Sequence, residues 1–311
     1  ADNVHVTINR ETGDFSVYAD RKVVEFVEDP AEEVSLVEAQ KQNTNAEVGD
    51  ILKVPVHSDK FGRIATQNAK NVILQKIREE ERKVLFDQYH GNEKEVVTGI
   101  VQRVVGHNVS VNLGKADAIL AENEQVKGET FKPTERIKVY ILEVKDTPKG
   151  PRILVSRTHP GLVKRLFESE VAEVKDGTVE IKSIAREAGS RTKLAVWSND
   201  PDVDPVGACV GVNGARVSAI VNELRGEKID IINWDENPAI LIENALSPAK
   251  VIAVMADPDE KTALVVVPDY QLSLAIGKEG QNARLAARLT GFKIDIKSET
   301  QARESGDFYD Y

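Results

Sequence analysis

One unit of sequence occurs twice in the second half of this chain. The segments "ACVGVNGARVSAIVNELRGEKIDI" and "LAIGKEGQNARLAARLTGFKIDI" align with an offset of 66 residues at their paired glycines. Each has an apolar pair, Gly-x-x-Gly, a helical stretch, a further glycine and then "KIDI". These are the only two Gly-x-x-Gly spacings in the chain, so a shared context of this length indicates two copies of one small fold.

Periodicity predicts the secondary structure of the repeat. Two strand-like runs precede each copy, "TVEIKSIA" and "TKLAVWS" before the first, "AKVIAVMA" and "TALVVVP" before the second. The glycines that follow each helical stretch, Gly226 and Gly291, suit a helix C-terminus. After the first loop, apolar residues at i, i+3, i+4 and i+7 predict one buried helix face: Val217, Ile220, Val221 and Leu224. The unit is strand, strand, helix, Gly-x-x-Gly, helix, strand.

Glycine-rich loops of this kind can grip phosphate groups. Without a Cβ the backbone can approach a ligand closely, and the N-terminus of the following helix attracts anions. Neither copy has the Lys-Ser/Thr that completes a P-loop, nor the third glycine of a dinucleotide-binding loop. A tight turn between two helices remains the other interpretation, but two copies in matching contexts favour a binding role.

The repeat resembles the KH domain in its bacterial arrangement, with a leading helix. In KH domains the glycine loop clamps about four nucleotides of a single strand, and the bases lie in an adjacent apolar groove. The resemblance therefore implies two sites for RNA. Arg284 could instead pair with an acidic neighbour. The implied contacts are the two loops and one arginine after each: Gly211, Val212, Asn213, Gly214 and Arg216, then Gly277, Lys278, Glu279, Gly280 and Arg284.

The block 93–158 predicts a small closed barrel. It contains five strand-like runs, "EVVTGIVQRVV", "NVSVNLG", "ADAILA", "RIKVYILEVKD" and "PRILVSRT", separated by turn residues. The pattern resembles the OB-fold repeats of the large RNA-binding protein of the small ribosomal subunit, which bind single strands with basic and planar side chains. A barrel that only spaces its neighbours is the alternative. The matching positions are Arg103, His107, Lys115, Lys138, Tyr140 and Arg157.

The first part of the chain predicts a mixed domain followed by a long helix. "VHVTINR" and "FSVYADR" are expected to pair across the turn "ETGD", with a helix in "PAEEVSLVEAQK" and a strand in "DILKVPV". A helix from 63 to about 89 is expected to bridge this domain to the barrel, with one apolar face: Ala65, Ala69, Val72, Ile73 and Ile77. A further helix begins near Pro160. The expected domains are 1–92, 93–158, 159–246 and 247–311.

Composition limits the classes of function. The net charge of −10 argues against a globally basic nucleic-acid binder, and only 93–158 has an excess of basic residues, 11 against 9. Cys209, the single cysteine, excludes an internal disulfide and fits a reducing cytoplasm. The apolar runs are too short to cross a bilayer, and no signal sequence is apparent. The scattered histidines have no metal-ligand spacing, and no nucleophile and base can be paired, so neither a cofactor nor an enzyme is expected.

The order of domains resembles the NusA family of bacterial transcription factors. The stretches "VTINRETGDFSVYA", "SRTHPGLVKRLFESEVAEV" and "IKSIAREAGSRTKLAV" look like that family, as do both glycine-loop repeats. The resemblance implies an α+β multidomain chain, with an N-terminal α/β domain lacking its opening helices, an OB barrel and two KH domains.

The same resemblance implies a non-enzymatic, monomeric regulator. Such a factor binds RNA polymerase through the N-terminal domain and nascent RNA through the barrel and KH domains. It promotes pausing and intrinsic termination, and acts in antitermination with other factors. The alternatives are an RNA-binding accessory module of an RNA-processing or ribosome-associated complex, and a protein-docking scaffold.

Overall fold

We describe the chain from a computed structural model, which covers residues 2–12, 14–57 and 63–308, the side chains of 63–66 excepted. The chain divides into two compact units, Ala1–Glu81 and Arg82–Tyr311, each described here by itself. None of the helices within the described residues is long and apolar enough to cross a membrane.

The first unit is a small sheet with one helix. Strand β1 (Val4–Ile8) pairs antiparallel with β2 (Phe15–Val24), as predicted, with Ile8 opposite Phe15. β4 (Ile51–Pro55) pairs antiparallel with β2, and the short β3 (Glu33–Ser35) pairs parallel with it. The side chain of Ser35 caps helix α1 (Leu36–Gln42). The core of this unit is correspondingly small: Val23, Val34, Ala39 and Ala46.

Helix α2 (Arg63–His90) confirms the predicted long helix, but not its predicted apolar face. Ala69, Val72 and Ile77 are exposed, Val72 by 68%, and Ile73 is half-buried. Ala65 lies outside the residues whose side chains are described. The last turns of α2 do pack, because Tyr89 is buried against the barrel and its hydroxyl donates to the carbonyl of Leu113 at 3.1 Å.

Five strands close the predicted barrel. They are β5 (Val96–Val105), β6 (Asn108–Asn112), β7 (Asp117–Leu120), β8 (Arg136–Thr147) and β9 (Gly150–Ser156). Their order around the barrel is β5-β6-β7-β9-β8, antiparallel except where β7 runs parallel to β9. Alternate residues point inward, as a half-buried strand requires, and fill the interior. The centre includes Val109, Val111, Leu120, Ile141 and Ile153.

The first KH unit follows helices α3 (Pro160–Glu170) and α4 (Ala172–Lys175). Strand β10 (Val179–Glu187) pairs antiparallel with β11 (Arg191–Ser198), which pairs parallel with β12 (Lys228–Asn233). Between β11 and β12 lie α5 (Pro205–Val210), the glycine loop with a 3-10 turn η3 (Val212–Gly214), and α6 (Ala215–Glu223). This is the predicted order of elements.

The second KH unit repeats the same topology. Helix α7 (Pro238–Ala245) leads into β13 (Ala253–Asp257) and β14 (Thr262–Val267). A 3-10 turn η4 (Asp269–Gln271), helix α8 (Leu272–Ile276), the glycine loop with η5 (Lys278–Gly280), and α9 (Gln281–Thr290) follow. Strand β15 (Lys293–Ser298) pairs parallel with β14, and α10 (Glu299–Glu304) ends the described fold.

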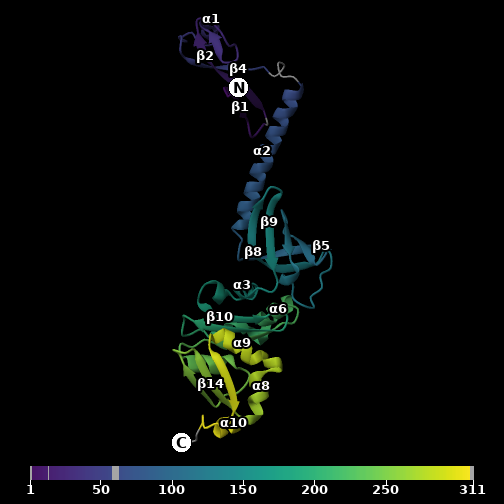
Figure 1. Cartoon of the computed structure of the whole chain (residues 1–311), viewed down its shortest axis with the longest axis vertical. Coiled ribbons are helices and arrows are strands. Elements are labelled where there is room, and N and C mark those ends of the chain that lie inside the picture. Colours follow the sequence, from purple (N-terminus) through teal and green to yellow (C-terminus); the bar gives the residue numbers. More distant parts are fainter. Residues whose placement is uncertain (1, 13, 58–62, 309–311) are drawn as a thin grey trace. The chain divides into compact units, whose positions relative to one another are not determined.

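One of the two apolar cores in this region extends across both KH units. Leu194 and Val196 of β11 point to the helices of their own unit, where they pack with buried Cys209. Ala195, between them, points to the other face and packs with helices of the second unit, including Leu285 of α9. Figure 1 shows α9 beside β10, and contacts join α9 to both β10 and β11. Successive residues of β11 therefore point to opposite faces of the sheet and pack against the helices of both KH units.

Candidate nucleic-acid interface

The two glycine loops have the same backbone conformation. The first glycines, Gly211 and Gly277, have φ, ψ of 78°, 174° and 79°, 171°. The third positions, Asn213 and Glu279, are left-handed, with φ of 55° and 53°. The loops are "GVNG" and "GKEG", so their two middle residues differ while their dihedrals agree. The glycines therefore set the shape of the turn, and the middle residues are free to differ.

The two glycines of each loop have different structural roles. A Cβ on Gly211 would lie 2.8 Å from Cγ of Arg216, and one on Gly277 would lie 2.8 Å from the backbone nitrogen of Asn282. The first glycine thus allows two helices of the protein itself to meet closely. A Cβ on Gly280 would meet nothing closer than 3.8 Å. The second glycine borders open space, where a ligand backbone could lie.

The middle of each loop faces solvent and precedes a bare helix end. Val212 is 83% exposed, and Asn213, Lys278 and Glu279 are exposed or half-exposed. Because glycine is the N-cap residue of both α6 and α9, no N-cap side chain accepts from the first-turn amides. These amides are the groups that bind phosphate oxygens at a helix N-terminus.

Arg216, predicted to contact phosphate, has a second role inside the domain. Its Nη1 donates to Oε2 of Glu173 at 2.8 Å and to the carbonyl of Ala208 at 2.7 Å. Asn282 occupies the same place in the second copy, and its Nδ2 donates to the carbonyl of Ala275 at 2.9 Å. In both copies the side chain at this position donates a hydrogen bond to a carbonyl of the helix before the loop. The role that Arg216 has in common with Asn282 is therefore to hold the two helices of its unit together.

Arg284 lies against its own loop and against the other KH unit. Its Nη1 donates to the carbonyl of Glu279 at 3.0 Å, and its Nε donates to Oε1 of Glu187 at 2.5 Å. Pairing with an acidic neighbour, the alternative that the sequence leaves open, is thus present. The hydrogen bond from Arg284 lowers the pKa of Glu187, opposed by partial burial. The Arg284 side chain is still 43% exposed.

The candidate barrel residues do not lie together. Arg103 on β5 and His107 in the β5–β6 turn are exposed near one end of β6, beside exposed Val104 and Val105. Lys115 is exposed at the opposite end of β6, in the turn to β7. Lys138 on β8 is half-buried. Of these candidates, Arg103 and His107 lie together at the β5–β6 turn, where Glu122 lies 3.9 Å from Nδ1 of His107.

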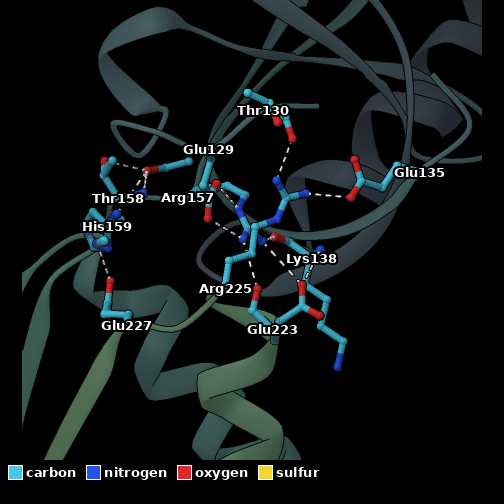
Figure 2. A network of polar contacts seen from close by, with 12 residues as sticks. Glu129, Thr130, Glu135, Lys138, Arg157, Thr158, His159, Glu223, Arg225 and Glu227 are labelled. Carbon is cyan, nitrogen blue, oxygen red and sulfur yellow. Dashed lines mark hydrogen bonds and ion pairs between the residues drawn. The ribbon is translucent and has the colours of Figure 1, made fainter. Parts of the chain in front are cut away.

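Tyr140 and Arg157 are corrections to the predicted barrel surface. Tyr140 is 8% exposed and stacks on the ring of His159, with centroids 4.6 Å apart. Arg157 is 1% exposed and forms a bidentate pair with Glu129, at 2.9 and 2.8 Å. Its Nη1 also donates to Oε1 of Glu223 at 3.3 Å (Figure 2). Both side chains join the barrel to the first KH unit, so neither offers an open surface to RNA.

Sequence analysis missed this joint between the barrel and α6. Burial disfavours the charge of Arg157, but Glu129 and Glu223 outweigh it, so the pKa of Arg157 is raised. Arg225 adds bonds from Nη1 to the carbonyl of Thr130 at 2.6 Å and from Nη2 to Oε1 of Glu135 at 2.8 Å (Figure 2). The partners are 28 to 95 residues apart along the chain, beyond any local pattern.

A second buried ion pair holds the β10–β11 turn. Glu227, fully buried, accepts from Nε and Nη2 of Arg186, from the backbone of Gly189 at 2.6 Å and from Thr192 Oγ1 at 2.8 Å. Both oxygens of the carboxylate therefore accept hydrogen bonds, as buried charge requires. The turn that Glu227 fixes ends β10 at Glu187, the residue that reaches the second glycine loop.

Cys209 gives a first testable prediction. Burial raises the pKa of its thiol to about 11. Because the folded pKa exceeds the unfolded one, the stability gained from the neutral thiol is present below about pH 8.5 and is lost as the pH rises toward 11. At pH 8 we expect alkylation of the native protein to be more than about 100-fold slower than of protein unfolded in urea. Equal rates would contradict the burial of this residue.

Known proteins match the chain from end to end. Family models match residues 1–83 (NusA N-terminal domain), 91–156 (S1 RNA binding domain), 157–234 (NusA-like first KH domain) and 238–304 (NusA-like second KH domain). The transcription termination/antitermination protein NusA of Bacillus subtilis is 58% identical, over 98% of this chain and 82% of that protein.

Two further comparisons agree in sequence. NusA of Thermus thermophilus is 44% identical over 94% of this chain and 76% of that protein. The solution structure of the N-terminal domain of NusA from B. subtilis is 46% identical, covers 26% of this chain and 64% of that chain, and has a TM-score of 0.20. On the identity of these matches, which cover 82% and 76% of the two relatives, this chain belongs to the NusA family of transcription termination/antitermination proteins.

Proposed function

We propose that this chain is a non-enzymatic cytoplasmic factor that binds RNA polymerase and nascent single-stranded RNA, and so changes pausing, intrinsic termination and antitermination. The names of its full-length relatives and its matched RNA-binding domains support this proposal. The observation that carries it is the pair of glycine loops with equal backbone conformation, exposed middle residues and bare helix N-termini. We further propose that it acts as a monomer.

RNA would bind along the KH pair by backbone fit more than by charge. A phosphate at each loop would accept hydrogen bonds from the first-turn amides of α6 or α9, next to Gly214 or Gly280. Lys278 adds a positive charge at the second loop and Val212 an apolar contact at the first. Because one core spans both KH units, the two loops keep a fixed position relative to each other. Two weak binding sites linked in this way can gain about 10²–10⁴ in avidity.

The barrel would extend the same binding surface. Arg103 and His107, exposed beside Val104 and Val105, supply a cation and a planar ring of the kind that single strands stack on. Four further candidate RNA contacts are Lys115, Lys138, Arg216 and Arg284. Tyr140 and Arg157 are left out because they are buried. The barrel alone should bind weakly, since few aromatic side chains lie on this surface.

Transcription through an intrinsic terminator tests the proposal. With bacterial RNA polymerase, the native protein should increase the fraction of terminated transcripts. A variant with Val212→Asp, Asn213→Asp and Lys278→Asp places carboxylates where phosphates would lie, so it should lose most of the effect while still co-sedimenting with polymerase. If native protein neither sediments with polymerase nor changes termination, the proposal fails, and an accessory module of another RNA complex is the better interpretation.

A further inference from the structure

One carboxylate of the first KH unit reaches the glycine loop of the second. Glu187 ends strand β10, and its side chain is 20% exposed. Its Oε1 accepts from Nε of Arg284 and lies 3.9 Å from Nη1 of Arg288. Its Oε2 accepts a hydrogen bond from Nε2 of Gln281 at 2.8 Å. The same Nε2 also donates to Ser190 Oγ at 2.6 Å. Gln281, Arg284 and Arg288 all belong to α9, the helix that follows the second loop.

The guanidinium of Arg284 lies beside the second glycine of this loop, where it can reach a phosphate bound there. Nη1 lies 3.0 Å from the carbonyl of Glu279, and 3.8 Å from the place of a Cβ on Gly280. The group therefore borders the open space beside the second glycine. Its exposed part faces solvent, while Nε is held by Glu187. A carboxylate and a phosphate oxygen bind a guanidinium in the same way, so they compete for it.

We propose that Glu187 is an internal competitor for RNA, a carboxylate that occupies Arg284 when the loop is empty and yields it to a phosphate when RNA binds. This inference rests on the proposed function of the second glycine loop. Glu187 lowers the affinity of that loop by engaging Arg284. It is a determinant of affinity that belongs to one KH unit and acts on the other.

The buried turn fixes the backbone from which the Glu187 carboxylate extends. Glu227 and Arg186 hold the β10–β11 turn by a fully buried network, so Glu187 cannot withdraw with the backbone. Exchange of partners therefore requires side-chain movement, which Arg284 can supply. The side chain of Arg284 is long and 43% exposed, and among the described residues Glu187 and Glu279 engage its Nε and Nη1.

Fluorescence anisotropy with a labelled, unstructured A- and C-containing RNA tests the proposal on the full chain. Glu187→Gln keeps an oxygen for Gln281 but removes the charge. We expect it to increase RNA affinity about three- to tenfold at low salt, because it frees Arg284 for a charge-assisted contact with a phosphate, with a smaller gain at high salt. Arg284→Gln should weaken binding and reduce the slope of log affinity against log salt by about 0.7.

Two further variants separate this inference from its alternatives. Glu180→Gln makes the same change at the other end of β10, where Glu180 pairs with Lys182 and Asn199, and should leave affinity unchanged. In the Arg284→Gln background, Glu187→Gln should give at most a small gain, because the two residues act through one contact. Thermal unfolding of Glu187→Gln should match the native protein, which shows that the KH pair remains packed.

The outcomes are distinct. If Lys278→Asp abolishes RNA binding while Glu187→Gln changes nothing or weakens it, Glu187 is a structural link between the KH units and this inference is overturned, although the loop still binds RNA. If the gain from Glu187→Gln is equal with and without Arg284, competition for the guanidinium is wrong. If the native protein binds no RNA at all, the proposed function fails and this inference fails with it.

Discussion

Replacing Arg157 with methionine is expected to lower the free energy of unfolding of the Arg82–Tyr311 unit by about 3–5 kcal/mol. The change removes a guanidinium that is 1% exposed and leaves Glu129, itself almost fully buried, without its bidentate partner. It also removes donors from the carbonyls of Lys138 and Glu223. A buried charge stripped of its partner costs far more than the net value of the pair, which is why the effect should be large.

Urea unfolding followed by tryptophan fluorescence measures this effect. Both tryptophans, Trp197 and Trp234, lie in the first KH unit, which the joint connects to the barrel. The midpoint should fall by more than about 1 M urea. Arg152→Met, an exposed arginine of the same strand region, should move it little. Adding Glu129→Met to Arg157→Met should recover part of the loss, and a midpoint unchanged by Arg157→Met would contradict the joint.

The second large effect is expected at the first glycine of a loop. Gly277→Ala has to adopt φ 79° and ψ 171°, a region almost confined to glycine, and its Cβ would press on the backbone nitrogen of Asn282 at 2.8 Å. Strain of this backbone kind costs about 1–3 kcal/mol, and the clash adds to it. Gly280→Ala has only the left-handed cost of about 1–2 kcal/mol, because its Cβ would meet nothing closer than 3.8 Å.

We expect Gly277→Ala to affect mainly the stability of the second KH unit, and Gly280→Ala to affect mainly its affinity for RNA. Gly277→Ala should destabilise the second KH unit more than Gly280→Ala, measured by hydrogen exchange of the β14 amides. Gly280→Ala, whose added methyl group fills the space beside the loop, should weaken RNA binding while the fold persists. If the two variants are equally destabilised, the first and second glycines do not differ in structural role as their surroundings indicate.

Sequence patterns predicted most of the elements because these depend on local spacing. The duplicated loop and its helices follow from glycines and an i, i+3, i+4 periodicity, and the five barrel strands follow from alternation and turn residues. The same methods misjudged α2. Val72 and Ile77 repeat at helical spacing, but within the described part of its unit they are exposed, because periodicity shows that a face is apolar and not what covers it.

The joints between domains could not be predicted in this way. Arg157 and Tyr140 are a cation and an aromatic ring on a barrel, which fits an RNA-binding surface as well as a buried joint. Only the fold shows that Glu223, 66 residues further on, comes to meet Arg157. Likewise Glu187 and Arg284 are 97 residues apart, and neither stands out in the sequence as a partner of the other. Long-range ion pairs leave no periodic signal.

The central claim is that RNA lies on the two glycine loops, and fluorescence anisotropy with an unstructured RNA tests it most directly. The loop variant Val212→Asp, Asn213→Asp and Lys278→Asp is compared with Val37→Asp, Asn45→Asp and Lys149→Asp, which makes the same three changes at exposed positions elsewhere. We expect the control to bind as the native protein does, and the loop variant to lose at least about tenfold in affinity, since three added carboxylates oppose phosphates at close range. Equal binding by the two folded variants would contradict the claim and place the RNA on the barrel.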